Sequence, residues 1–174
     1  KPIIYALGII VLVSCQPNTQ GKKIQEKVFQ WQGTEMTVPP LTAINWNGLD
    51  SCNLYDRYDY KMVYHINGDC HACVDHLPKI DSLYQTVKTS NTTLLIYVFS
   101  GDYAHFENLV ERINIKIPFI YDKQNLFYSQ NKLSIDPLYH CFLLDKDNKV
   151  LLVGSPISNP KMWALYKQRM TQTQ

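Results

Sequence analysis

Hydrophobic and polar positions change their spacing along the chain from about residue 60 onward, which predicts strands and helices in alternation. Residues 93–99 form an unbroken apolar run, T-L-L-I-Y-V-F, typical of a strand buried on both faces of a sheet. Between Cys70 and Val87, apolar side chains recur at every third or fourth position, which predicts one face of a helix. The remaining predicted elements are strands at 61–66, 117–121, 139–144 and 149–153, and helices at 103–113, 125–133 and from 158. This order, βαβαβαββα, predicts an α/β fold with a mixed sheet between helices.

The first residues follow a different pattern. Lys1 precedes an uncharged apolar run over residues 3–13, which is too short for a membrane span of roughly 20 residues and is typical of a signal peptide. The run ends in L-V-S-C, which resembles the lipobox of bacterial lipoproteins, with Cys15 as the acylated residue. We therefore expect a signal peptide over 1–14, a lipid-anchored flexible tether over 15–26, and a folded domain over 27–174. A plain secretory signal with an incidental cysteine is the alternative.

The folded part begins with an expected β extension. Residues 27–46 carry β-type residues with a turn at Gly33 and the pair Pro39-Pro40, which indicates a strand pair or an extended arm. The chain is 45% hydrophobic and 18% charged, which suits a globular protein with a core. Its net charge is only +2, with no Lys/Arg-rich patch, so we expect no nucleic-acid partner.

The stretch N-G-D-C-H-A-C, residues 67–73, carries the candidate chemistry. A C-x-x-C pair between a strand and the start of a helix is typical of a redox pair, because a helix N-terminus favours a thiolate. Cys70 would attack a substrate disulfide, and Cys73, one turn later, would resolve the mixed disulfide. His71, as imidazolium, would favour the thiolate of Cys70. Asp69 would cap the helix start and oppose the thiolate through its charge.

Three further features resemble the thioredoxin superfamily, in particular its TlpA/ResA-type lipoproteins. Pro78 lies five residues after the second cysteine, S-I-D-P at 134–137 precedes a strand, and the segment F-L-L-D-K-D-N-K-V-L-L-V-G is similar to the closing hairpin of the family. The resemblance implies a thioredoxin-like fold, with residues 117–133 as an inserted strand and helix. It also implies that Pro137, in the cis form, and Asp136 shape the substrate groove.

The same resemblance implies an activity, and the lipobox-like ending of the apolar run implies a place in the cell envelope. The chain would be a membrane-anchored thiol–disulfide oxidoreductase that faces the periplasm and reduces or exchanges disulfides in exported proteins. Its electrons would come from a membrane partner protein, and no cofactor is expected. The sequence departs from the family pattern in three places. Asp69 stands in place of the usual tryptophan, His71-Ala72 in place of Gly-Pro, and Tyr64 where a buried acid often accepts the proton of the second cysteine.

Two other functions remain open at this point. Cys70, His71, Cys73 and His76 lie within seven residues and could hold copper or zinc, with His140 and Cys141 as the candidates for a further ligand pair. The fold could also serve as a non-catalytic binding module in which the cysteine pair is inert. The other cysteines, Cys52 and Cys141, could form a second disulfide, although the sequence favours a buried free thiol at Cys141.

Overall fold

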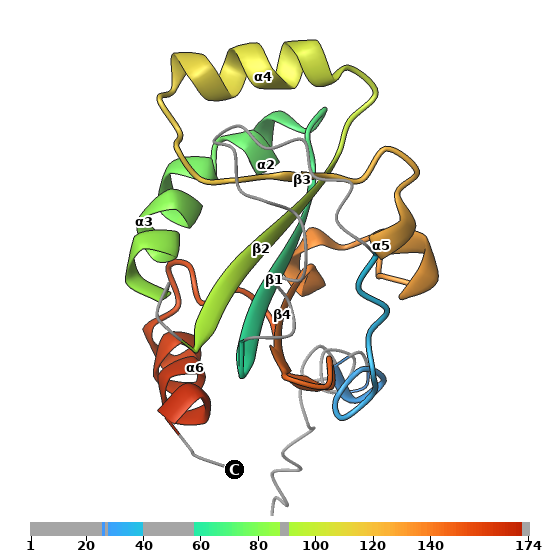
Figure 1. The fold of residues 1–174 in the computed structure, drawn as a ribbon, viewed down its shortest axis with the longest axis vertical. Coiled ribbons are helices and arrows are strands. Elements are labelled where there is room, and N and C mark those ends of the chain that lie inside the picture. Colours follow the sequence, from blue (N-terminus) through green and yellow to red (C-terminus); the bar gives the residue numbers. More distant parts are fainter. Residues whose placement is uncertain (1–25, 27, 40–57, 88–90, 172–174) are drawn as a thin grey trace, which may run out of the picture.

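A computed structural model describes residues 26, 28–39, 58–87 and 91–171. Its core is a five-stranded mixed sheet with the strand order β3-β2-β1-β4-β5 (Figure 1). β2 is parallel to both β1 and β3, and β4 is antiparallel to both β1 and β5. The strands are β1 (Tyr60–Asn67), β2 (Thr92–Phe99), β3 (Ile120–Tyr121), β4 (Cys141–Asp145) and β5 (Val150–Val153). The predicted mixed sheet flanked by helices is therefore confirmed.

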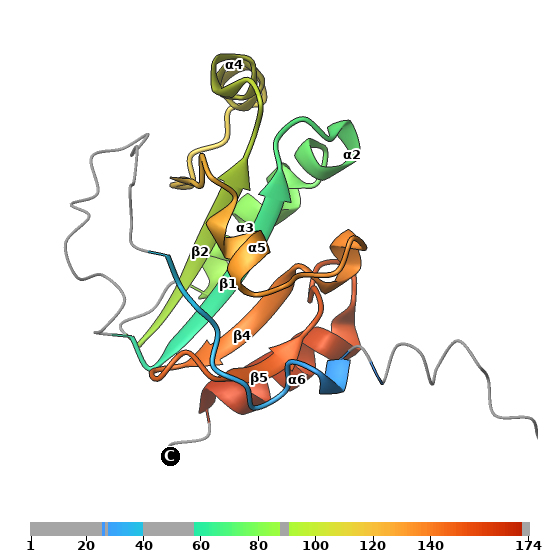
Figure 2. The same cartoon turned by 90° about the vertical axis from the view of Figure 1, so that its right-hand side faces the viewer.

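Helices cover both faces of this open sheet (Figures 1 and 2). Side chains from α3, α4 and α6 pack into one apolar cluster with Met62 and Ile96. On the opposite face, Phe127 of α5 packs with Val63 and Phe142. The helices are α2 (His71–Val74), α3 (Leu77–Val87), α4 (Tyr103–Arg112), α5 (Leu126–Gln130), the 3₁₀ helix η1 (Pro137–Tyr139) and α6 (Pro160–Thr171).

Strand β1 is the central strand of the sheet. Seven of its eight side chains are buried, and the first seven side chains of β2 are buried as well. This agrees with the continuous apolar pattern that is typical of strands covered on both faces. Its carboxyl end leads directly into the C-x-x-C segment. Parallel pairing with β2 continues to the last residues of both strands, Asn67 and Phe99, so the loops that follow them begin side by side.

Three predicted elements have different bounds in the structure. The helix predicted from Cys70 to Val87 is two helices, because the chain turns at 75–76 and Pro78 lies in the first turn of the second helix. A proline clashes with the preceding helical turn, so an unbroken helix is disfavoured at this point. The predicted strand at 117–121 is reduced to two residues after Pro118, whose missing N–H suits the end of an edge strand. The strand predicted from Tyr139 begins at Cys141, because Tyr139 belongs to η1.

The N-terminal segment crosses the sheet face that α5 also covers (Figure 2). Gly33 N–H donates to Val150 O (2.8 Å), and the Tyr97 hydroxyl donates to Pro39 O (3.1 Å). Of the two alternatives, residues 28–39 form no strand pair: residues 28–33 are helical and turn residues, and residues 34–39 join the β4–β5 hairpin through a single bridge, Glu35 to Lys149. This segment is held by buried side chains, led by Trp31, more than by a strand ladder.

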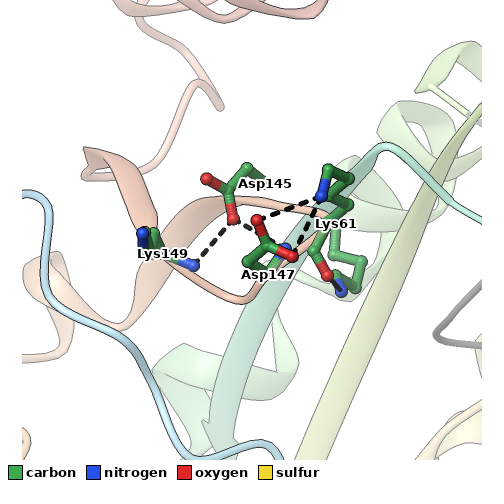
Figure 3. Close-up of polar contacts among 5 residues, drawn as sticks. Lys61, Asp145, Asp147 and Lys149 are labelled. Carbon is green, nitrogen blue, oxygen red and sulfur yellow. Dashed lines mark hydrogen bonds and ion pairs between the residues drawn. The ribbon is translucent and has the colours of Figure 1, made fainter. Parts of the chain in front are cut away.

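The hairpin between β4 and β5 is fixed by a buried carboxylate (Figure 3). One oxygen of Asp145 accepts hydrogen bonds from the backbone N–H groups of Asp147 and Lys149, both at 2.9 Å. The ammonium of Lys61, which is 1% exposed, donates to the carbonyl oxygen of Lys146 (2.9 Å). Asn148 takes the left-handed conformation that completes the turn. The hairpin predicted from D-K-D-N is thus confirmed, with β1 contributing to its turn.

The expectations for residues 1–25 and for Cys52 fall outside the described residues. Within the described ranges, no helix has the length and apolar character needed to cross a bilayer.

Substituting Trp31 tests how firmly the N-terminal segment is attached. The Trp31 ring is 5% exposed and packs edge-on against Phe142, with centroids 5.7 Å apart. We expect Trp31→Ala to lower the free energy of unfolding by about 3–5 kcal/mol, the usual cost of removing a buried large aromatic ring. Phe29→Ala is the matched control, because Phe29 is 60% exposed. Urea unfolding that gives the two variants equal stability would contradict this assignment.

Candidate active site

The cysteine pair lies at the carboxyl end of the parallel strands. Loops of α/β sheets gather at this edge and commonly bind ligands there. The loop after β1 carries Cys70, and the loop after β2 carries Ser100 and Gly101. Because β4 is antiparallel to β1, the segment before β4 reaches the same edge, where His65 N–H donates to His140 O (3.0 Å). The sheet thus brings three loops to the edge at which the two thiols lie.

Cys70 is the N-cap residue of α2, a helix of four residues. Its sulfur accepts the backbone N–H of Cys73 at 3.3 Å, a contact that suits a negatively charged sulfur. The two cysteines are free thiols 2.5 Å apart, in position for a disulfide to form. The prediction that Asp69 caps this helix is wrong, because the Cys70 sulfur occupies the capping position and Asp69 points to another loop.

Cys73 differs from Cys70 in its environment. It is half-buried, and its side chain packs against the apolar cluster on the α3 side of the sheet. Burial raises the pKa of the Cys73 thiol to about 12, and the hydrogen bond and the charge of Cys70 act in the same direction. Cys73 therefore stays protonated at neutral pH, which suits a thiol that acts second.

Asp69, directly before Cys70, is tied to the loop after β2. One of its oxygens accepts from the Ser100 hydroxyl (2.6 Å), and the other accepts from Gly101 N–H (2.9 Å). The bond from Ser100, followed by that from Gly101, lowers the pKa of the Asp69 carboxyl below its ordinary value. Its side chain is exposed, and its carboxylate links two loops at the rim of the site.

The two histidines of the C-x-x-C segment are exposed. His71 begins α2, and His76 lies in the break between α2 and α3. The described residues contain no group of three or more His, Cys, Asp or Glu side chains arranged to hold a metal ion. The structure thus gives no support to the alternative metal site of Cys70, His71, Cys73 and His76.

The segment before β4 also differs from its prediction. The expectation of a cis Pro137 is wrong, because every peptide bond in the described ranges is trans. Pro137 begins η1, where its fixed φ suits helical geometry and its missing N–H costs nothing, and Asp136 caps this helix by accepting from Leu138 N–H (3.1 Å). Sequence reasoning missed the two apolar side chains that flank this pair. Ile135 and Leu138 are 90% and 72% exposed.

Tyr64 lies at the strand position where related proteins often carry a buried acid that accepts the proton of the second cysteine, as the resemblance implies. Its hydroxyl lies 2.6 Å from the Ser155 hydroxyl, and burial raises its pKa far above its ordinary value. A phenol in this state is no proton acceptor for a thiol. Cys141, predicted as a buried thiol, is 1% exposed and contacts the Tyr166 hydroxyl at 3.3 Å, which confirms the prediction.

A buried histidine pair links β1 to the segment before β4, whereas the sequence suggested His140 only as a candidate metal ligand beside Cys141. The Nδ1 atoms of His65 and His140 lie 3.2 Å apart, so one ring donates and the other accepts. Nε2 of His140 lies 2.6 Å from Ser134 O, which can only accept, and Nε2 of His65 lies 2.9 Å from the Asn125 amide. Their separation of 75 residues leaves no local signal by which the sequence could have paired them.

This histidine pair predicts a loss of stability in acid. Burial, aided by the charge of His140, lowers the pKa of His65 to about 4. Burial also lowers the pKa of His140. Between the ordinary value near 6.5 and about 4, the unfolded chain binds a proton that the folded chain does not, so stability falls as the pH falls through this window.

We expect His65→Gln to be less stable at pH 7 and to lose less stability between pH 7 and pH 4.5 than the wild type. Urea unfolding at several pH values measures both effects. His105→Gln, which removes an exposed imidazole, is the control. A wild-type slope in His65→Gln would show that another group causes the acid sensitivity.

Comparison with known proteins adds structural relatives. Neither a family model nor a curated protein matches the chain. A thiol:disulfide interchange protein from Bacteroides sp. aligns over 82% of this chain and 93% of its own, with TM-score 0.59 and 17% identity. The thioredoxin domain of a thiol-disulfide oxidoreductase from Bacteroides vulgatus aligns over 77% and 96%, with TM-score 0.56 and 18% identity. The exposed lipoprotein thioredoxin of Streptococcus pneumoniae aligns over 65% and 87%, with TM-score 0.52 and 17% identity. The chain therefore has a thioredoxin-like fold.

Proposed function

We propose that the chain is a thiol–disulfide oxidoreductase that uses Cys70 and Cys73. The observation that carries the proposal is the chemical difference between two adjacent thiols. The Cys70 sulfur accepts an N–H at a helix start, whereas burial keeps Cys73 protonated. The thioredoxin-like fold supports it, because the solved structures of similar fold include thiol-disulfide oxidoreductases. A short C-x-x-C loop also adds little stability as a staple, which disfavours an inert pair.

In the reducing direction, the Cys70 thiolate attacks one sulfur of a substrate disulfide. A mixed disulfide forms, and the other substrate sulfur leaves as a thiolate and takes a proton from solvent. Cys73 then loses its proton and attacks the sulfur of Cys70, which closes the Cys70–Cys73 disulfide and releases the second substrate thiol. The substrate gains two electrons and two protons, and the protein dithiol loses them. Because Tyr64 is no proton acceptor, deprotonation of Cys73 would need water, His71 or another group.

The segment before β4 is the proposed contact for the substrate chain. Asp136 and Pro137 were predicted to shape a substrate groove, and Pro137 is exposed beside the apolar side chains of Ile135 and Leu138. An exported protein that presents a disulfide in an extended, partly apolar segment suits such a surface. The trans peptide bond changes the expected geometry of this loop but leaves it at the same edge of the sheet as Cys70.

We further propose that the protein acts in the cell envelope, anchored by a lipid on Cys15 and supplied with electrons by a membrane protein. The apolar run followed by L-V-S-C supports the anchor. A lipoprotein among the solved structures of similar fold makes this combination reasonable. Acyl chains on Cys15 would hold the domain at the membrane, since each buried CH₂ contributes about 0.8 kcal/mol.

The roles of the two cysteines predict which variant traps partners. In cells that express the chain, Cys73→Ala should accumulate mixed disulfides through Cys70, because no second thiol resolves them. Cys70→Ala should accumulate few, because Cys73 is half-buried and protonated. Non-reducing electrophoresis after acid quenching measures both variants, with the double variant as the background. Equal trapping by the two single variants would contradict the assignment.

A redox titration of the wild type tests the activity itself. Mass shifts after alkylation report the Cys70–Cys73 pair in glutathione and dithiothreitol buffers. We expect a reversible two-electron transition between about −270 and −120 mV, the range of known exchange proteins. The absence of a reversible transition would favour the inert module, and bound metal that blocks both thiols would favour the metal site.

The lipid anchor predicts a separate result. Cys15→Ser should abolish incorporation of labelled palmitate and move the protein from the membrane fraction to the soluble fraction. Cys52→Ser is the control, because it removes a cysteine outside the signal sequence. Palmitate incorporation that persists in Cys15→Ser would contradict acylation at this position.

A further inference from the structure

We propose that Asp69 is a positioning residue for Cys70, and that the lock formed by Asp69, Ser100 and Gly101 holds the nucleophile in its reactive place. This inference rests on the proposed thiol–disulfide exchange and deepens it. In this role Asp69 neither caps α2 nor acts through the effect of its charge on the Cys70 thiolate.

The lock consists of two bonds to one carboxylate. The Ser100 hydroxyl donates to Oδ1 of Asp69 at 2.6 Å, and Gly101 N–H donates to Oδ2 at 2.9 Å. Hydrogen bonds to an ionised acceptor are roughly twice as strong as neutral ones. Because the two bonds use different oxygens and different donors, they fix both the position and the orientation of the carboxylate.

The backbone next to the lock leaves little freedom. Gly68 N–H donates to Phe99 O at 2.7 Å. A Cβ atom on Gly68 would lie only 3.0 Å from side-chain atoms of Ser100 and Phe106. The loop that carries Cys70 and the loop that carries Ser100 therefore touch at Gly68 as well as at Asp69. Since β1 and β2 are rigidly paired up to these loops, the lock connects the cysteine loop to the sheet through a second point.

A further set of bonds extends the lock to the cysteine. Asn67 accepts Asp69 N–H with its side chain (3.0 Å) and Cys70 N–H with its carbonyl oxygen (3.2 Å). The three residues 67–69 and the N-cap thus form one compact turn. A change that releases the Asp69 side chain would free this turn on its exposed side, directly before the reacting sulfur.

The position of Cys70 matters because disulfide exchange is directional. The thiolate must approach the substrate sulfur along the line of the breaking S–S bond, and small displacements of a reacting group lower rates strongly. The bonds from Ser100 and Gly101 also hold the pKa of the Asp69 carboxyl below its ordinary value, which favours the ionised form that accepts both bonds.

The positioning role and a charge effect predict opposite results. If Asp69 acted only through its charge, removing it would favour the thiolate and speed the reaction. If Asp69 positions Cys70, removing it should slow the reaction. Asp75→Ala is the matched control for charge and should not slow the reaction, because Asp75 lies in the same segment, is exposed and, among the described residues, makes no side-chain bond to the loop after β2.

The experiment measures the rate at which Cys70 forms a mixed disulfide with glutathione disulfide. A Cys73→Ala parent isolates this step. In this parent we expect Asp69→Ala to react about tenfold more slowly. The rate of Ser100→Ala should fall between the rates of the parent and of Asp69→Ala. The double variant should react no more slowly than Asp69→Ala. Non-additivity of this kind is the mark of two residues that act as one unit.

A variant that removes a helix cap without replacing Asp69 or Ser100 is the control for general loss of stability. Asp102 caps α4 by accepting from His105 N–H (2.9 Å), and alanine lacks this acceptor, so Asp102→Ala should melt at a lower temperature and still react within twofold of the parent. Rates of Asp69→Ala equal to or above the parent, or effects of Asp69→Ala and Ser100→Ala that multiply, would overturn the lock. A parent that does not react with glutathione disulfide would overturn the proposed function and this inference together.

Discussion

The pairing of β1 with a parallel strand on one side and an antiparallel strand on the other is the constraint on which the site depends. The parallel partner ends where β1 ends, and it therefore delivers Ser100 next to Gly68. The antiparallel partner starts near that end, and it delivers His140 and the segment before it. No residue of the site lies on a long independent loop. The two thiols thus follow directly after a strand that is buried on both faces and paired on both sides, and this strand fixes their position at the surface.

Much of the fold could be predicted from the sequence because its elements carry local signals. The apolar run of β2, the helical spacing of α3 and the turn residues of the last hairpin each identify an element without reference to the rest of the chain. The N-terminal segment carried no such signal. Its position depends on Trp31 packing on Phe142, a contact between residues more than a hundred positions apart, and β-type composition alone suggested strands.

The candidate site was predictable in part for the same reason. The C-x-x-C pair is a local motif, so its position at the start of a helix followed from the sequence. The partners of its neighbours are non-local. Asp69 is a residue type that often caps helices, but its carboxylate accepts a hydrogen bond from Ser100, which lies 31 positions away. The sulfur of Cys70 instead caps α2 by accepting from Cys73 N–H. Pro137 likewise was assigned a cis bond by resemblance, whereas its neighbours allow it to begin a 3₁₀ helix.

The shielded Cys141 has a consequence for biogenesis. A chain that folds in an oxidising compartment exposes all its thiols at first, and Cys141 becomes inaccessible only when β4 has paired with β1 and the Tyr166 hydroxyl has closed over the sulfur. Before that moment, Cys141 competes with Cys70 and Cys73 for oxidants and can be scrambled into a wrong disulfide. Tyr166 belongs to the last helix, so this protection is complete only after nearly the whole chain has emerged. In an oxidising compartment, a chain that is truncated before α6 or that folds slowly would keep the Cys141 thiol accessible, so docking of α6 would limit wrong disulfides.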